Sequence, residues 1–410
     1  MPNTNLTVDW IGNEALRLAH EKAAFIGTIN REFDSSFRPG YGNTIRIRVP
    51  SQYTTRTGRV MDVQDGVQQS TQLVVGTQWG VDMRYNSQEM SQDLVNFQKL
   101  HLEPAMAQLV SMIESSTLQR ATEATYNTVG LAGSTITTLR YMGLARARLN
   151  QYLAPKGGGR NMQIDSVTMS DLVDGFSNFT NPASDISEQY REGFVARTGM
   201  ADFYENERVY NLANTSDVTA WLDTYTIVDG DVDFTVSGLS IAPTAGMVFT
   251  VTGGGTASTA RIFACHPETK EAYSHAQQFV VTGGTTTSLI FQPPIRLSGA
   301  RKNVCNSDGT DLTTSGTAIL TSMINFIGSI SSTYPNPLMY HRDAFTFATA
   351  ALPLMDDAIR CVVKTYDGLS LRVWEGSDIR NDEKLTRIDI LWGFAAIRPQ
   401  WSCRLIGGGV

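Results

Sequence analysis

The sequence has few of the side chains that most catalytic and metal sites use. In 410 residues it holds only five histidines and four cysteines. The cysteines are far apart and form no CxxC pair, so we expect free thiols in a reducing compartment rather than a disulfide framework. Cys265, His266 and His275 match no standard zinc spacing and lack a fourth ligand, which argues against a metal site.

Sequence signatures of enzymes and of cofactor binding are absent too. The glycine-rich runs "APKGGGRN" and "VTGGGT" match neither a Walker loop nor a dinucleotide-binding fingerprint. No GxSxG or HExxH motif and no paired-carboxylate signature occurs. The sequence therefore predicts no enzymatic activity and no cofactor.

Positive charge and long hydrophobic runs are also scarce. The net charge is −7, whereas a protein that grips DNA through its phosphates needs a basic surface. No stretch approaches the roughly 18 apolar residues of a membrane span. Residues 1–25 show no basic region followed by an apolar core, as a secretory signal would. We therefore expect no membrane association, no tight binding to nucleic acid, and folding in a cytoplasm.

Two alternating runs near the N-terminus predict strands. Residues 44–50, "TIRIRVP", place Ile45, Ile47 and Val49 on one face, and residues 73–85 alternate over a longer distance. Together the runs predict a long hairpin that projects from the body. Because an isolated two-stranded hairpin is marginally stable in water, this one should lie on another surface.

Helical and β-rich patterns occupy separate blocks of the chain. Residues 8–30 predict an amphipathic helix, residues 93–126 a long helix and residues 138–154 another. Residues 217–335 are rich in Thr, Val, Gly and Ser, with turn signals about every 8–12 residues, which is typical of a β-sandwich or small barrel. A mixed pattern returns near residue 338, so we interpret the β-rich block as a domain inserted into an α/β host.

Charge is distributed unevenly along the chain. The segment 37–60 contains no acid and five arginines, Arg38, Arg46, Arg48, Arg56 and Arg59. The segment 200–235 has eight acids against one arginine, and these acids include Asp229, Asp231 and Asp233. This last motif, "VDGDVDF", lacks the glycine and glutamate of a calcium loop, so a turn is the better interpretation. We hypothesise that the basic arm of one copy meets the acidic segment of another; two solvated polar faces are the simpler alternative.

The C-terminal stretch "TYDGLSLRVWEGSDIRNDEKLTRIDILWGFAAIRPQ" predicts a hairpin with an unusually polar loop. Strands are expected at 369–374 and 386–392, with a loop between them at 375–384. The charged residues of this loop are Glu375, Asp378, Arg380, Asp382, Glu383 and Lys384. No nucleophile, metal cluster or phosphate loop lies nearby in the sequence, and a merely solvated hairpin loop is one interpretation of these charges.

The order of these parts resembles the major capsid (coat) proteins of short-tailed double-stranded DNA bacteriophages that carry an inserted β-barrel domain. The most specific stretch is the C-terminal one: a Gly before an alternating strand, a charged hairpin loop, Arg387 and Asp389 on the next strand, then Pro399. "LMYHRDAFTFATAALPL" is similar to the family's return strand, "GFVARTGMADFYENERV" to the segment before the insertion, "LEPAMAQLVSMIESSTL" to its spine helix, and "NTIRIRVPSQYTTRTGRV" to its extended loop. Some members have a long charged loop early in the inserted domain, where this chain has only "VDGDVDF".

The resemblance implies an α+β fold, the tailed-phage major capsid fold with axial and peripheral domains, an extended hairpin loop and an inserted all-β barrel. The implied division is an N-terminal arm and helix (1–36), the extended hairpin loop (37–85), the peripheral domain with the spine helix (86–130), the first part of the axial domain (131–215), the inserted barrel (216–338), and the second axial and peripheral part (339–410).

The resemblance also implies a function. Copies would form pentamers and hexamers that close into an icosahedral shell, with the charged residues named above at subunit contacts. A scaffolding protein and a portal protein would be partners, double-stranded DNA would be packaged inside without sequence-specific binding, and assembly in the bacterial host cytoplasm would give a protein of the virion. A phage tail or fibre component, or a carbohydrate-binding adhesive β-domain protein, is the alternative, and a metal- or sugar-dependent enzyme is the third option.

Overall fold

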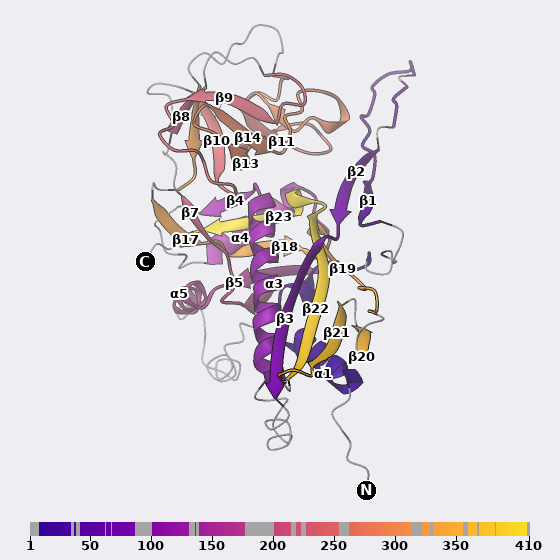
Figure 1. Cartoon of the computed structure of the whole chain (residues 1–410). Helices are drawn as coiled ribbons and strands as arrows, with labels where there is room; N and C mark the ends of the chain where they lie inside the picture. Colours follow the sequence, from indigo (N-terminus) through magenta and orange to yellow (C-terminus); the bar gives the residue numbers. More distant parts are fainter. Residues whose placement is uncertain are drawn as a thin grey trace, which may run out of the picture. The chain divides into compact units, whose positions relative to one another are not determined.

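The computed structural model divides the chain into two compact units (Figure 1). Unit 1 comprises 1–48, 70–118 and 345–397, and unit 2 comprises 49–69, 119–344 and 398–410. The residues that the structure describes are 8–33, 37, 42–61, 63–66, 68–86, 101–130, 136, 139–176, 201–214, 219–222, 227–253, 262–312, 322–328, 331–355, 360–366, 369–381 and 383–407.

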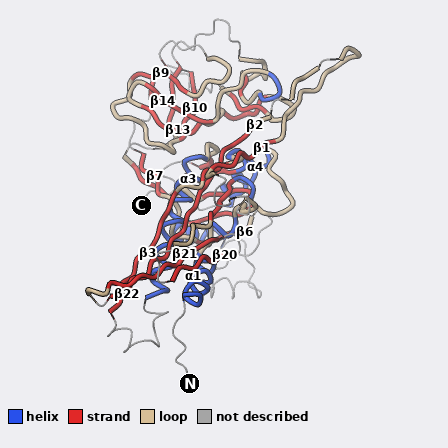
Figure 2. The backbone as a smooth tube through the Cα atoms, turned by 45° about the vertical axis from the view of Figure 1, so that its right-hand side comes forward, coloured by secondary structure: helices blue, strands red, loops and turns tan. Residues whose placement is uncertain are grey.

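Unit 1 is built on a five-stranded antiparallel sheet (Figure 2). Its strands run in the order β19–β22–β21–β20, and β3 also pairs with β22. The strands are β3 (Thr77–Asn86), β19 (Phe345–Ala350), β20 (Arg360–Tyr366), β21 (Leu369–Asp378) and β22 (Glu383–Ala396).

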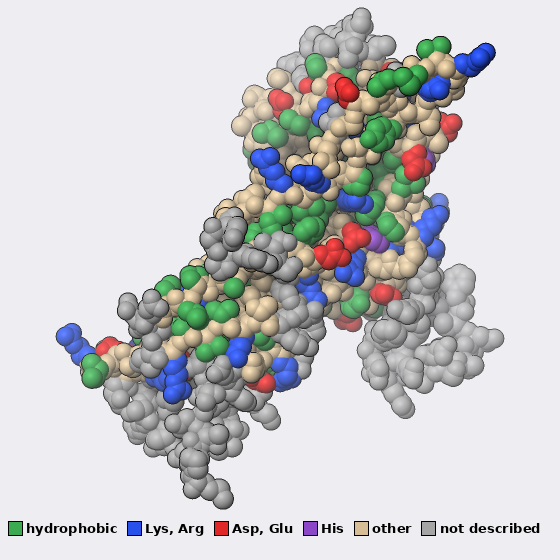
Figure 3. Space-filling view, turned by 90° about the vertical axis from the view of Figure 1, so that its right-hand side faces the viewer, with side chains coloured by type: hydrophobic (Ala, Val, Ile, Leu, Met, Phe, Trp, Pro, Cys, Tyr) green, Lys and Arg blue, Asp and Glu red, His purple; other side chains and the backbone are tan. Residues whose placement is uncertain are grey.

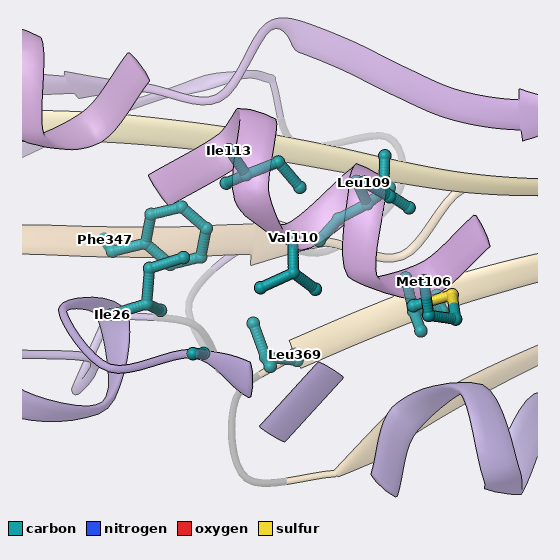
Figure 4. A pocket seen from close by; sticks show the side chains of 10 residues that line it. Ile26, Met106, Leu109, Val110, Ile113, Phe347 and Leu369 are labelled. Atoms are coloured by element: carbon teal, nitrogen blue, oxygen red, sulfur yellow. The ribbon is translucent and has the colours of Figure 1, made fainter. Parts of the chain in front are cut away.

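Apolar faces of two helices pack against this sheet. They are α1 (Val8–Lys22) and α3 (Glu103–Ala124), which confirms that helices form near the N-terminus and in the spine. The helix expected at 8–30 ends earlier, at Lys22, and residues 93–100 of the helix expected at 93–126 lie outside the described residues. A 3₁₀ turn, η1 (Ile26–Thr28), lies between α1 and β1 in sequence. Figure 4 shows the packed region, where a cavity of only about 20 Å³ remains, barely the space for one water. Its lining is entirely apolar: Ala23, Ile26, Met106, Leu109, Val110, Ile113, Phe347, Leu369, Leu371 and Ile390.

The prediction of one continuous strand at 73–85 is wrong. The chain forms β2 (Gln69–Val74), which pairs with β1 (Thr44–Val49), and then starts β3 at Thr77. The break occurs at Val75, whose side chain is buried and whose amide donates to the Asn43 carbonyl at 2.9 Å. Only the first part of the run therefore belongs to the hairpin, because the second part pairs along ten residues with β22.

A buried ion network joins β21 and β22, and β3 packs closely against it. The Asp389 carboxylate on β22 accepts hydrogen bonds from Arg372 Nη2 at 2.7 Å and from Arg387 Nε at 2.8 Å. Asp389 is 0% exposed and Arg372 4%. Gly80 of β3 lies opposite Asp389, and a Cβ there would stand 2.5 Å from the carboxylate, so no larger residue fits without a shift. These contacts set the register of β3, β22 and β21.

Unit 2 contains a mixed sheet in the order β4–β23–β18–β5–β6. Helices α4 (Leu139–Gln151) and α5 (Ser166–Phe176) contribute Met142, Leu149 and Leu172 to the core with this sheet. The strands are β4 (Thr128–Gly130), β5 (Arg160–Ile164), β6 (Asp202–Glu205), β18 (Leu338–His341) and β23 (Ser402–Ile406).

The inserted β-rich block is a closed barrel, as the sequence predicts. Its order is β10–β13–β14–β9–β8–β16, and a three-stranded sheet β12–β11–β15 accompanies it. A two-stranded ribbon of β7 (Asn211–Asn214) and β17 (Ser332–Pro335) pairs the chain before the barrel with the chain after it. Five buried phenylalanines fill the barrel core: Phe234, Phe249, Phe279, Phe291 and Phe326. The remaining strands are β8 (Thr219–Leu222), β9 (Asp233–Ser237), β10 (Val248–Gly253), β11 (Phe263–Cys265), β12 (Ala272–Ala276), β13 (Phe279–Gly284), β14 (Ser288–Gln292), β15 (Val304–Cys305) and β16 (Ser322–Phe326).

Polar contacts connect the inserted domain to the rest of unit 2. The Tyr273 hydroxyl donates to the Gln151 carbonyl at 2.7 Å. The Gln278 side chain exchanges two hydrogen bonds with the Thr128 backbone, at 2.8 and 3.0 Å. His275 stacks on Tyr273 at 5.2 Å, and its buried Nε2 has no hydrogen-bond partner among the described residues. Burial and then the nearby Arg148 guanidinium lower the pKa of His275 to about 3.

Replacing Asp389 with alanine tests the ion network. The change leaves Arg372 buried without its carboxylate, so we expect the free energy of unfolding to fall by about 3–5 kcal/mol. Denaturant unfolding followed by tryptophan fluorescence measures it. Asp82→Ala is the matched control: Asp82 is 77% exposed and 3.8 Å from Arg387, so its loss should cost less than about 1 kcal/mol. Equal effects of the two substitutions would contradict the network's importance.

The half-buried His275 predicts a stability change with pH. The unfolded chain binds a proton at this imidazole below about pH 6.5, whereas in the fold the pKa of His275 is about 3. Stability is therefore lost as the pH falls through this window, by up to about 1.4 kcal/mol for each pH unit. We expect His275→Gln to show a shallower loss between pH 6 and 4 in thermal unfolding, with a control comparison at pH 8. An unchanged slope would show that His275 is not the group responsible.

Candidate functional site

The candidate contact residues lie on three surfaces, and two of them, Arg38 and Asp382, fall outside the described residues. The first surface is the arm, which we define as residues 44–74. The second is the acidic turn at 228–233, and the third is the tip of the β21–β22 hairpin.

The arm is anchored at its base and exposed along its length. Ile47 and Leu73 are buried in a small core with Phe37, Ala348 and Ala395. Arg46 and Arg48, on either side of Ile47, are exposed. Beyond Val49 the chain runs out as a loop and returns to β2 (Figure 2). The alternation of buried and exposed residues therefore directs the two arginines to solvent.

The loop of the arm has its own internal contacts. The Gln64 side chain bonds both the amide and the carbonyl of Thr54, each at 2.8 Å, which ties the outgoing chain to the returning chain. Arg56 donates to the Gly58 carbonyl, and Arg59 is exposed nearby in sequence. In Figure 3, hydrophobic and basic side chains both reach the end of this arm.

Exposed hydrophobic residues at the arm loop were missed from the sequence. Their exposed fractions are large, from 64% for Tyr53 to 85% for Val60. Apolar side chains that are exposed close together in sequence make this loop a candidate interaction surface. In the sequence, "QYTTRTGRVMDV" places apolar residues beside a glycine that favours a turn. The prediction of a contact surface rested on the arginines of this segment and did not include its apolar residues. The set is Tyr53, Val60, Met61 and Val63.

Part of the negative charge of the acidic turn is paired within the inserted domain. Asp229 pairs with Arg296 at 3.0 Å and accepts from the Leu297 amide at 2.9 Å. Asp231 accepts from the Val228 amide at 2.6 Å, and Gly230 has φ +100°, so the motif is a turn. Asp233 begins β9 and is exposed. Within the part of the chain that the structure describes, no cluster of three or more His, Cys, Asp or Glu could hold a metal.

The predicted bounds of the charged loop, 375–384, are wrong. Strand β21 continues to Asp378 and β22 begins at Glu383, so most of the charged stretch belongs to the sheet. Lys384 pairs with the buried Glu375 at 3.0 Å, and Glu383 pairs with Arg84 of β3 at 3.3 Å. These cross-strand partners were not visible in the sequence, because Arg84 is far from Glu383 along the chain.

The tip of the hairpin is short and ordered by Asp378. The Asp378 carboxylate accepts hydrogen bonds from the Arg380 amide at 2.9 Å and from the Asn381 side chain at 2.7 Å. Ile379, which lies between Asp378 and Arg380 in the chain, is 99% exposed. The tip thus presents one apolar and one basic side chain on a rigid turn.

None of these surfaces has the geometry of a catalytic centre. They are exposed, extended and rich in charge and apolar side chains, which suits contacts between proteins. Among the described residues, no helix is long and apolar enough to cross a membrane.

Comparisons with known proteins address the identity of the chain. A family model described as "P22 coat protein - gene protein 5" matches residues 41–408. No curated protein matches the sequence. Solved structures with a similar fold include one titled "Mycobacterium phage Che8", with 10% identity, 93% of this chain and 90% of that chain covered, and a TM-score of 0.48. Another is titled "Capsid structure of the Cyanophage P-SCSP1u", with 8% identity, 90% and 84% covered, and a TM-score of 0.44.

The family match spans the arm, the spine helix, the closed barrel and the C-terminal strands, and it extends well beyond half of the sequence. The chain therefore belongs to the P22 coat protein family.

Proposed function

We propose that copies of this chain form pentamers and hexamers that close into the icosahedral shell of a tailed double-stranded DNA phage. The chain is the major capsid protein of such a particle. The observation that carries this conclusion is the family match over residues 41–408, which includes the inserted barrel. The tail-fibre and adhesive alternatives explain the β domain alone and leave the arm and the spine helix without a role.

We propose that the arm contacts a neighbouring copy. Its exposed apolar side chains gain free energy when they leave water, and its arginines steer the encounter with an acidic surface. The acidic turn, through Asp231 and Asp233, and the hairpin tip, through Ile379 and Arg380, are the other proposed contacts. Asp229, Glu375, Glu383 and Lys384 contribute less directly, because each already has a charged partner in its own chain.

We further propose a scaffolding protein and a portal protein as assembly partners, in the cytoplasm of a bacterial host. The net charge of −7 supports packaging of DNA without tight binding, because an acidic chain repels phosphates. The proposed role needs neither catalysis nor a cofactor. The division of the chain into six parts, which the family resemblance implies, stays a prediction.

Electron microscopy of the purified chain, made together with its scaffolding partner, tests the proposed function. We expect closed shells, or open sheets and spirals of capsomers. A dispersed small monomer at all salt and protein concentrations would overturn the proposal.

Charge reversal on the arm tests its role. Because Arg46 and Arg48 are exposed and Ile47 between them is buried, we expect Arg46→Glu with Arg48→Glu to leave the fold intact and to block shell formation. Circular dichroism checks the fold, and sedimentation with electron microscopy measures assembly, with at least a tenfold loss of particles expected.

A charge-matched control is Arg140→Glu with Lys156→Glu, two exposed positions outside the arm segment 44–74. This variant should assemble in near-normal yield. Normal particles from the arm variant, or an equal loss in both variants, would rule out a specific role for the arm.

A further inference from the structure

One edge of strand β3 (Thr77–Asn86) is open in the part of the chain that the structure describes. The strand lies along β22 and pairs with it through one edge (Figure 1), and no described segment pairs with the other edge. Gly80 is exposed although it has no side chain, so solvent reaches the backbone here. The N–H and C=O groups of a free edge are a template for pairing with another strand.

This edge has none of the usual structural protection against pairing. Proteins block free edges with a proline, a lysine or a bulge, or they keep the edge strand short. The ladder between β3 and β22 runs through ten residue pairs without a shift in register, and the sequence "TQWGVDMRYN" contains neither proline nor lysine. A second extended segment can therefore pair along β3 without distorting it.

The charges of β3 are complementary to themselves. Asp82 and Arg84 are 77% and 70% exposed, and they share one face of the strand, with Met83 on the other face. When two copies of β3 pair antiparallel about a two-fold axis at Met83, each Asp82 lies opposite the Arg84 of the second copy. Moving the axis by one residue brings two aspartates or two arginines opposite each other, which is destabilising.

Ion pairs within the chain leave both charges available for this contact. Arg84 lies 3.3 Å from Glu383, and Asp82 lies 3.8 Å from Arg387. Exposed ion pairs contribute little to stability, so the two side chains can turn toward a second copy at small cost.

The opposite face of β3 fits the same register. Trp79, Val81 and Met83 are half-buried on this face, and the Trp79 ring packs edge-on against Trp392 of β22 at 5.3 Å. These apolar side chains keep contact with water in a single copy. In the register centred on Met83 the methionines of two copies lie opposite each other, and part of this apolar surface leaves water.

We propose that two copies of this chain associate through β3, as an antiparallel two-fold pair of edge strands centred on Met83. The pair joins two sheets of unit 1 into one continuous sheet. Neighbours within a pentamer or hexamer make heterologous contacts, whereas this contact is isologous. It therefore connects one ring to the next. This placement rests on the proposed function, but the pairing itself does not.

Site-specific cross-linking of the full-length chain tests the register. The Met83→Cys variant is made together with its scaffolding partner, oxidised with copper phenanthroline and run on a denaturing gel without reducing agent. We expect a band at twice the mass of the chain, because opposite Cα atoms in an antiparallel pair are about 4.5–5.5 Å apart, within the span of a disulfide. The wild-type chain, treated in the same way, controls for the native cysteines.

The Val81→Cys variant is the matched control for distance. Val81 is half-buried on the same face as Met83. In the proposed register the two copies of this residue are separated by roughly 13 Å along the strand, too far for a disulfide. Absence of the dimer band from Met83→Cys, or an equal band from Val81→Cys, would overturn the proposal.

Charge exchange separates contacts between copies from contacts within one chain. Asp82→Arg or Arg84→Asp places like charges opposite each other across the two-fold axis, so each change, added to Met83→Cys, should lower the yield of dimer roughly tenfold. The combined exchange restores opposite charges between copies, and the yield should recover. Within one chain the same exchange puts like charges beside both Glu383 and Arg387. A combined variant with less dimer than either single variant would therefore contradict the pairing.

The outcomes distinguish this proposal from the proposed function. Shells without the link at position 83 would overturn the strand pairing and leave the shell function intact. Linked dimers without shells would support the pairing and count against the shell function. A link from position 83 to another segment, or to the scaffolding partner, would show a different occupant of the edge and would also overturn the pairing.

Discussion

The buried carboxylate of Asp389 is the interaction on which unit 1 depends. It is held by Arg372 from β21 and by Arg387 from its own strand, and β3 contributes the space for it through Gly80. A buried charge without a partner is costly, and a slip of one residue would turn each side chain to the opposite face. The β21–β22 hairpin and β3, which comes from a distant part of the chain, are therefore held in one register.

The position of the arm follows from this register. With β3 paired along β22, the chain before Thr77 must leave the sheet, and Val75 is buried where it does so. At Gly393 of β22, a Cβ would stand 2.2 Å from the Val74 carbonyl, so only glycine lets the chain pass. The arm is thus fixed at its base, while its loop exposes apolar and basic side chains. A packed base and an exposed loop are consistent with the contact to another copy that we propose.

The inserted barrel is stabilised by an apolar core rather than by a buried ion network. Its core closes on itself around stacked and edge-on phenylalanines, such as Phe249 and Phe279 at 5.5 Å. Its contacts with the rest of unit 2 include polar ones, as between Gln278 and Thr128. A domain with a complete core and a polar attachment can be inserted between two paired strands, here β7 and β17, without disturbing the host sheet.

The sequence by itself determined the inserted β-rich block, the long helix and the absence of catalytic signatures, because those features rest on local periodicity and composition. Whether the block was a sandwich or a closed barrel stayed open until the strand pairing was known. Alternation in 73–85 correctly predicted extended structure, but it suggested one strand where the chain forms β2 and β3, and it could not identify the partner strand. Only the tertiary structure decided that β3 pairs with β22, that Lys384 neutralises a buried Glu375, and that Asp229 is paired with Arg296. The reason is physical: strand pairing and ion pairs join residues that are distant in sequence, and local patterns do not record such contacts.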